Sequence, residues 1–289
     1  MSYNRAPAAD LAPWVARLYA TKVEAPPDHR LNCGIFNDTA VIRIQLAGQW
    51  TAETADGHLS LSRSALYCGP QTRRLPITVT GSFISVGVSL RPGASMILGG
   101  TRVGDYIDRF VPLDEFGDEA DRVIGMYDAL STPEEWLQLL EDGIRESVAE
   151  HNAKPPDPIT ARFEDIAFTN PSISISEFAR QCGVEKRRVE RIIRRDFGLS
   201  PKQVLRRARA LDIASHLRGV ADDEEGEELM LRYYDQSHFI HEFTKLFGMS
   251  PSQFVITPQP LLTLALESRQ ARRLEAMERI APGASRPWE

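Results

Sequence analysis

The sequence predicts an α+β protein, with a small N-terminal β-barrel carrying a few helices and an all-α C-terminal part. Two observations support this prediction. Short apolar stretches separated by turn residues recur through the first 90 residues, as half-buried strands do. Near the C-terminus, a seven-residue sequence occurs twice at an offset of fifty residues, each time after a stretch with helical periodicity.

The repeated sequence reads Phe197-Gly198-Leu199-Ser200-Pro201-Lys202-Gln203 in its first copy and Phe247-Gly248-Met249-Ser250-Pro251-Ser252-Gln253 in its second. Glycine supplies the left-handed residue that ends a helix, serine caps the next helix, and proline suits its first turn. The repeat therefore predicts two helices that end near residues 197 and 247, each followed at once by another helix.

The helix before each copy is marked by apolar residues at helical spacing. Residues 185–197 carry Val189, Ile192 and Ile193 on one face and mostly arginines on the other, and residues 236–247 carry three phenylalanines, with Asp235 as the N-cap. A shorter helix over 174–182 ends at Gly183. A helix, a glycine turn and a basic helix form a helix-turn-helix, whose second helix enters the major groove of DNA.

Residues 175–254 resemble the DNA-binding domain of the AraC/XylS family of bacterial transcription regulators. The most distinctive stretch is Tyr234-Asp235-Gln236-Ser237-His238-Phe239, which is followed by the second copy of the repeat and Phe254. The resemblance implies seven helices, in which a long central helix, here 201–217, holds two reading helices. It also implies that these two helices face successive major-groove segments on one side of the DNA.

The same resemblance implies which side chains contact DNA. The positions that correspond to base-reading residues are Arg187, Glu190 and Arg191 on the first reading helix and Gln236, Ser237, Ile240 and His241 on the second. An arginine offers paired donors to guanine, and Glu190 is suited to accept from cytosine or to hold an arginine in place. We expect phosphate contacts from the basic residues around them, namely Lys186, Arg188, Arg194, Arg195, Lys202, Arg206 and Lys245.

The charge distribution favours this interpretation, although the whole chain has a net charge of −6. Residues 186–209 contain ten basic and two acidic residues, a net charge of +8 over 24 residues. A solvated basic surface is the alternative interpretation. Because the patch lies on a predicted reading helix and the helix that follows it, phosphate binding is favoured.

The second helix-turn-helix unit, whose reading helix is predicted over 236–247, departs from the family pattern in two places. Residues 222–228 contain six carboxylates, and Arg232 stands where the family has its turn glycine. The acidic run is either a solvated surface or a docking surface for the N-terminal part or for RNA polymerase. We therefore expect the first unit to supply most of the affinity for DNA.

The N-terminal part is predicted to contain a helix over 11–20 and strands over 39–46, 58–67, 75–80 and 83–90. Gly69-Pro70-Gln71-Thr72-Arg73 and the stretch 87–94 are similar to the cupin-like N-terminal domain of one branch of AraC-type regulators. That similarity implies a small-molecule pocket inside the barrel, with Trp50, Tyr67 and Arg91 as candidate effector-binding residues. Core packing of the two aromatics and a turn-stabilising role for the arginine are the alternatives.

Enzymatic chemistry is not indicated in this part. A metal-binding cupin needs a His-x-His pair, a carboxylate and a further histidine, whereas His29 and His58 each stand alone. No catalytic residue, metal or other cofactor is predicted.

Helices are predicted over 118–130 and from a capping box at Thr132-Pro133-Glu134-Glu135 onward. They are expected to pair two subunits, or alternatively to pack on their own barrel. The predicted domains are 1–150 for sensing and pairing, a proline-rich linker over 151–158, the DNA-binding domain over 159–256 and an extension over 257–289. In the extension, a helix over 260–280 would carry Arg269, Arg272, Arg273 and Arg279 on its outer face.

The whole-chain composition indicates a cytoplasmic protein. The apolar fraction is 42%, no apolar run approaches the roughly 20 residues of a membrane span, and three widely spaced cysteines suit a reducing compartment. The sequence thus predicts a homodimeric transcription regulator that binds double-stranded DNA and responds to a small-molecule effector. The alternative is a ligand-binding or enzymatic barrel whose helix-turn-helix module mainly binds protein, and steep salt dependence of DNA binding distinguishes the two.

Overall fold

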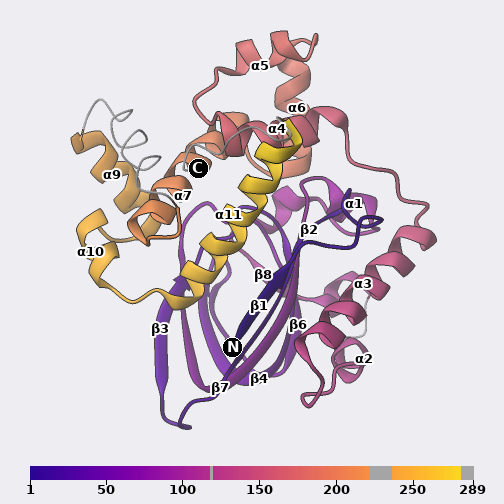
Figure 1. Ribbon diagram of the computed structural model, residues 1–289, viewed down its shortest axis with the longest axis vertical. Helices are drawn as coiled ribbons and strands as arrows, with labels where there is room; N and C mark the ends of the chain where they lie inside the picture. Colours follow the sequence, from indigo (N-terminus) through magenta and orange to yellow (C-terminus); the bar gives the residue numbers. More distant parts are fainter. Residues whose placement is uncertain (118–119, 222–235, 281–289) are drawn as a thin grey trace.

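The computed structural model describes residues 1–117, 120–221 and 236–280. An antiparallel sheet forms the N-terminal part and a group of helices forms the C-terminal part, as Figure 1 shows. The predicted α+β class is confirmed. The last helix, α11 (Pro260–Ile280), crosses in front of the sheet and reaches back toward α4 (Pro158–Thr169).

The sheet has eight strands in the order β1-β2-β7-β4-β6-β8, with β3 paired to β7 and β5 paired to β4. The two long central strands are β4 (Val41–Thr54) and β7 (Leu75–Leu90). The others are β1 (Ser2–Arg5), β2 (Val15–Val23), β3 (Arg30–Ile35), β5 (Gly57–Leu61), β6 (Ser64–Cys68) and β8 (Phe110–Pro112). No described strand joins β1 to β8, so the sheet is curved but open, and a barrel describes it only loosely.

The strand predictions were partly right. The stretches 75–80 and 83–90 form one continuous strand, β7. The first half of β7 pairs with β3, and its second half pairs with β2. The helix predicted over 11–20 is wrong, since most of that stretch belongs to β2. Both faces of β2 are partly covered, so its apolar residues do not alternate cleanly and imitate a helical pattern.

The two faces of the sheet support two separate cores. Ile84, Val86, Val88 and Leu90 alternate along β7 as predicted and pack with α2 (Ala120–Gly125) and α3 (Pro133–Glu150). The opposite face, inside the curve, holds Trp50 and Phe83 and meets Leu261 of α11. Between these elements lie α1 (Ala94–Ile97) and two 3₁₀ turns, η1 (Val103–Tyr106) and η2 (Leu113–Phe116).

Helix α3 begins at the predicted capping box, in which Thr132 and Glu135 satisfy each other's backbone N–H groups. Its apolar side chains Trp136 and Leu137 are fully buried against the sheet of the same chain. This apolar face therefore packs as the alternative interpretation expected, on its own N-terminal part.

The repeated sequence performs the predicted task twice. Gly198 and Gly248 adopt φ values of 71° and 73° and end their helices, and Ser200 and Ser250 cap the next ones with complete capping boxes. The helices are α5 (Ile175–Gln181), α6 (Lys186–Phe197), α7 (Pro201–Leu217), α9 (Gln236–Phe247) and α10 (Pro251–Ile256). The acidic run 222–228, Arg232, Tyr234 and Asp235 lie outside the described residues.

A segment between β3 and β4, residues 36–39, joins the two parts of the molecule. Phe36 is 2% exposed and belongs to the core of the second helix-turn-helix unit. Its ring meets Phe247 edge-on with centroids 5.3 Å apart. The core of the second unit is therefore completed by a side chain from the N-terminal part.

Asp38, two residues further on, is held by three arginines from α7 and α11. Its carboxylate accepts from Arg272 at 2.5 Å and lies 3.4 Å from Arg269, while Arg207 donates to its backbone carbonyl at 2.5 Å. Arg269 also pairs with Asp212 of α7. Burial acts to raise the pKa of Asp38, but the three arginines outweigh it and lower this pKa to about 2.

This cluster corrects one prediction about α11. Arg269, Arg272 and Arg273 were expected on the outer face of the helix, yet they are 3%, 6% and 8% exposed. They are buried because α11 lies between the sheet and α4 and α7, so that both of its long sides meet protein. The side chain of Arg279 is outside the described residues.

We expect Asp38→Asn to lower the free energy of unfolding by about 3 kcal/mol, because it leaves buried arginines without a counter-charge. Urea unfolding of the variant and the wild type measures this difference. Asp28→Asn, at an exposed position, is the matched control and should change stability by less than about 0.5 kcal/mol. Equal effects of the two substitutions would contradict the role given to Asp38.

The contribution of Asp38 should also depend on pH. Because its pKa is lowered in the folded state, its stabilising effect is present above the unfolded value near 4 and is lost as the pH falls toward about 2. The stability difference between the wild type and Asp38→Asn should therefore be complete above about pH 5 and should shrink progressively below about pH 4. A difference that stays constant down to pH 2.5 would contradict this assignment.

Candidate nucleic-acid interface and ligand cavity

Helix α6 presents one buried and one basic face. Val189 and Ile193 are fully buried in the core of the first unit, whereas Arg187 and Arg191 are exposed one turn apart. Within the described residues, no carboxylate lies within 4.0 Å of either of these arginines or of Arg188. These guanidinium groups are free to meet an anionic surface.

A groove lies next to this basic face, between the first unit and the start of α7. It is lined by Lys186, Glu190 and Arg194 from α6 and by Lys202, Arg206 and Arg209 from α7. Glu190 lies 4.0 Å from Lys186, and within the described residues no arginine lies that close to its carboxylate. Arg206 pairs with Glu242 of α9 at 3.0 Å and so ties α7 to the second unit.

Not every basic residue of the patch is available to a ligand. Arg195 donates to Asp196 at 2.6 and 2.7 Å, and Arg209 donates to the carbonyl of Pro171 at 2.7 Å. Arg207 is 3% exposed and donates to the carbonyls of Gln71 and Asp38. The exposed patch is therefore smaller than the net charge of residues 186–209 suggested.

Helix α9 presents a less basic surface, as expected. Phe239 and Phe243 are buried, while His241 and Lys245 are exposed and Ile240 is 42% exposed. The side chains of Gln236 and Ser237 lie outside the described residues. Lys245 is the one lysine or arginine among the described side chains of α9.

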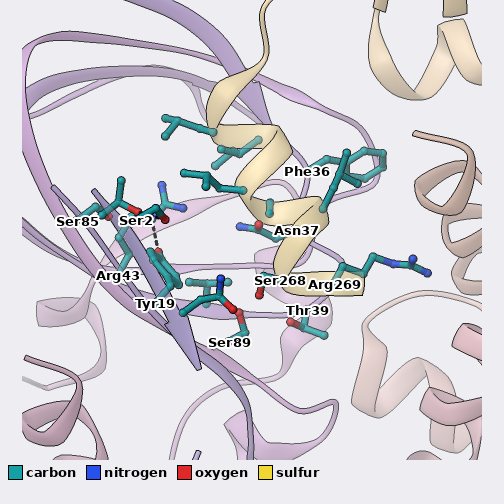
Figure 2. Close-up of a pocket in the computed structure, with 18 of the residues that line it drawn as sticks. Ser2, Tyr19, Phe36, Asn37, Thr39, Arg43, Ser85, Ser89, Ser268 and Arg269 are labelled. Atoms are coloured by element: carbon teal, nitrogen blue, oxygen red, sulfur yellow. Dashed lines mark hydrogen bonds between the residues drawn. The ribbon is translucent and has the colours of Figure 1, made fainter. Parts of the chain in front are cut away.

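A cavity lies between the inner face of the curved sheet and α11, and Figure 2 shows its lining. Strands β2, β4 and β7 provide Tyr19, Arg43 and Ser85, and α11 provides Ser268 and Arg269. Arg43 donates through Nε to the hydroxyl oxygen of Tyr19 at 3.0 Å. The cavity is thus formed jointly by the N-terminal sheet and the last helix.

The three candidate effector residues lie in three different places. Trp50 lines the cavity beneath α11. Tyr67 lines a second cavity, between the other face of the sheet and α3. Arg91 lines neither of these cavities; it donates to the carbonyl of Ala12 and to Glu164 of α4, both at 2.7 Å.

Sequence reasoning missed Arg43 and the role of α11 as the roof of this cavity. The signal for Arg43 was present, because it interrupts the apolar stretch Val41-Ile42-Arg43-Ile44 in a strand that is buried on both faces. A charged residue at such a position needs a specific reason to be there. No comparable signal in the sequence placed the helix 260–280 against the sheet.

The buried thiols are not reactive nucleophiles. Burial raises the pKa of Cys33 and of Cys68 to about 11, so both stay protonated at neutral pH. Among the described residues, no group of three or more histidine, cysteine or acidic side chains is placed to hold a metal ion. Within the same residues, no helix combines the length and the apolar character that a membrane span requires.

Comparison with known proteins agrees with this arrangement at the C-terminus. A family model described as a helix-turn-helix domain matches residues 178–255, and one described as a domain of unknown function (DUF6597) matches residues 3–112. No curated protein matches the chain.

Several solved structures of regulators are similar in part. ToxT from Vibrio cholerae is 8% identical, with 82% of this chain and 97% of that chain covered and a TM-score of 0.47. The C-terminal domain of AraT, a response regulator from Geobacillus stearothermophilus, is 22% identical, with 37% of this chain and 90% of that chain covered and a TM-score of 0.32. The AraC-like transcriptional activator CuxR is 14% identical, with 73% of this chain and 86% of that chain covered and a TM-score of 0.29.

The match of the helix-turn-helix model spans α6, the central helix α7 and the second copy of the repeat. Those are the elements that carry the exposed arginines and the two glycine-ended helices. The C-terminal region of this chain is therefore an AraC-type helix-turn-helix domain, the DNA-binding domain of a family of transcription regulators.

Proposed function

We propose that this protein is a transcription regulator that binds double-stranded DNA in a sequence-specific manner, mainly through α6. The observation that supports this most directly is the exposed face of α6, where Arg187, Arg188 and Arg191 have no carboxylate partner among the described residues. Such a row of unneutralised guanidinium groups on one helix is suited to the phosphates and guanine edges of a major groove.

The central helix gives the two units a fixed relation to each other. Helix α7 begins at the end of α6 and contacts both α6 and α9, and the Arg206–Glu242 pair reinforces the second contact. A rigid spacer of this kind would present α6 and α9 to the DNA together. The second unit adds less affinity, because His241, Ile240 and Lys245 offer fewer cationic groups than α6 does.

In this proposal the N-terminal part, residues 1–150, binds a small-molecule effector in the cavity beneath α11. Residues 151–158 link it to the DNA-binding domain over 159–256, and the extension over 257–289 contains α11, which lies against the sheet. Asn37 and Asp38 line the same cavity and belong to the segment that holds α7 and α11. A ligand there would contact the segment that connects the two parts.

Oligomerisation belongs to the same proposal. Regulators that bind paired half-sites are commonly dimers, and a homodimer would double the number of reading helices. Since the apolar face of α3 is used within the chain, we propose pairing through the exposed side chains nearby, Met126 at 50% and Leu130 at 90% exposure. Contact with RNA polymerase would follow DNA binding, and no enzymatic activity is part of this proposal.

Lys202 and Arg206 allow the phosphate contacts to be tested. Lys202→Ala should weaken binding to all DNA sequences alike and should lower the slope of log K against log salt by about one unit. Arg206→Ala should lower the slope less, because Arg206 is already paired with Glu242. Fluorescence anisotropy over a range of salt concentrations measures both slopes.

The control for this experiment is Lys154→Ala, an exposed lysine of the linker that should leave the slope unchanged. A slope that is the same in Lys202→Ala and the wild type would remove Lys202 from the DNA-binding surface. If the wild type shows no salt-dependent binding to any DNA, the proposed function itself is wrong.

Base reading is tested at Arg191 and His241, with DNA sequences selected in vitro from a random library as the cognate site. Arg191→Ala should lose about 1–3 kcal/mol of affinity for the cognate site and little for scrambled DNA. His241→Ala should lose less affinity for the cognate site, because His241 lies on α9, the reading helix that we expect to contribute less. Both variants are measured on both DNAs at one fixed salt concentration.

Equal losses of Arg191→Ala on cognate and scrambled DNA would make Arg191 a phosphate contact. A larger cognate loss for His241→Ala would reverse the ranking of the two units. Arg180→Ala serves as the matched control, because Arg180 is exposed on α5 and is already paired with Glu177.

A further inference from the structure

Arg43 is a buried cation without an anionic partner. It lies on β4 at the floor of the cavity beneath α11 and is 9% exposed. Among the described residues, no carboxylate lies within 4.0 Å of its guanidinium, whose Nε donates to Tyr19. Removing a guanidinium from water without a counter-charge is unfavourable, so this position calls for an anion.

The other charged groups of the cavity do not provide that anion. Among the described residues that line the cavity, Asp38 is the one carboxylate, and it is already engaged with Arg269 and Arg272. Burial acts to lower the pKa of Arg43, but its neighbours, Tyr19 first among them, raise it on balance. Arg43 therefore stays charged at neutral pH, and the cavity has more positive than negative groups.

Two polar groups near Arg43 offer hydrogen-bond donors. The indole Nε1 of Trp50 is buried and has no hydrogen-bond partner among the described residues, and this ring lies 5.9 Å from the Arg43 guanidinium. An indole N–H is a donor only. The Tyr19 hydroxyl accepts from Arg43 and keeps its own proton to donate.

The position of Tyr19 is fixed by Gly87 on the neighbouring strand. A Cβ atom at Gly87 would lie 2.4 Å from the ring of Tyr19, so the ring occupies space that any other residue would fill. Strand β7 therefore holds the tyrosine against Arg43. The result is a preformed group of donors at the floor of the cavity, beneath an apolar roof that includes Leu261 and Leu264 of α11.

We propose that this cavity binds a small organic carboxylate, with its acid group against Arg43 and its apolar body beneath α11. A carboxylate matches the planar guanidinium with two oxygens, accepts from the neighbouring donors and supplies the single negative charge that Arg43 lacks. The inference rests on the proposed function only in taking this cavity as the effector site.

The test compares a carboxylate with its uncharged amide on the full-length protein. Isothermal titration at pH 7 with 3-phenylpropanoate and 3-phenylpropanamide should show at least about tenfold tighter binding of the carboxylate, as expected for a charge-assisted hydrogen bond. Arg43→Gln should abolish this preference. Arg30→Gln, at an exposed position on β3, should keep it.

Three results would overturn the proposal: no binding of either compound, equal binding of the two, or an unchanged preference in Arg43→Gln. If Arg43→Gln does not fold, Arg43→Lys keeps the charge but loses the paired donors, and it should reduce the preference without removing it. A preference that is undiminished in Arg43→Lys would then overturn the proposal.

DNA binding of the ligand-free protein is measured in parallel, so that the two proposals fail separately. Salt-dependent DNA binding without carboxylate binding would overturn this inference alone. Carboxylate binding without DNA binding would overturn the proposed function and leave the site at Arg43 intact.

Discussion

The contact of residues 36–39 with the C-terminal helices is the interaction on which the rest of the arrangement depends. Phe36 enters the apolar core of the second unit, and Asp38 neutralises arginines that α7 and α11 bury. Arg207 and Arg272 need that acceptor, since buried guanidinium groups are stable only when they are paired. The position of the central helix relative to the sheet follows from these few contacts.

The sequence predicted best what short-range physics decides. Glycine ends, serine caps and first-turn prolines defined where α6 and α9 end and where α7 and α10 begin, and the periodicity of α6 separated its buried and basic faces. Those features depend on residues within one or two turns of one another. The open shape of the sheet and the pairing of β1, β3 and β8 depend on distant segments, and no local pattern predicted them.

In the candidate site, too, local features could be predicted and long-range contacts could not. The exposure of Arg187 and Arg191 on α6 could be predicted from helical spacing, because their own helix determines it. The burial of Arg207 and Arg269 could not, because it requires knowing that Asp38 lies opposite them. A count of basic residues therefore overestimated the surface available to DNA, and it gave no indication that arginines also hold the two parts together.

The two units contact the N-terminal part in different ways. The core of the first unit is made by α4 to α7, with Ile107 of the N-terminal part packed against it, and the core of the second takes in Phe36 from the segment between β3 and β4. Helix α6 of the first unit also contacts η1, and the N–H of Gly93 donates to the carbonyl of Asp196. Both units are therefore coupled to the part of the molecule that contains the cavities.

The placement of Phe36 has a consequence for protein engineering. A chimaera that joins this C-terminal region to the sensor of another regulator at residues 151–158 would replace the loop that carries Phe36. The graft would leave a ring-sized void beside Phe247 in the second unit, and voids of that size destabilise a core by several kcal/mol. Exchange of sensors in this protein should therefore transfer residues 36–39 together with the helices rather than with the sheet.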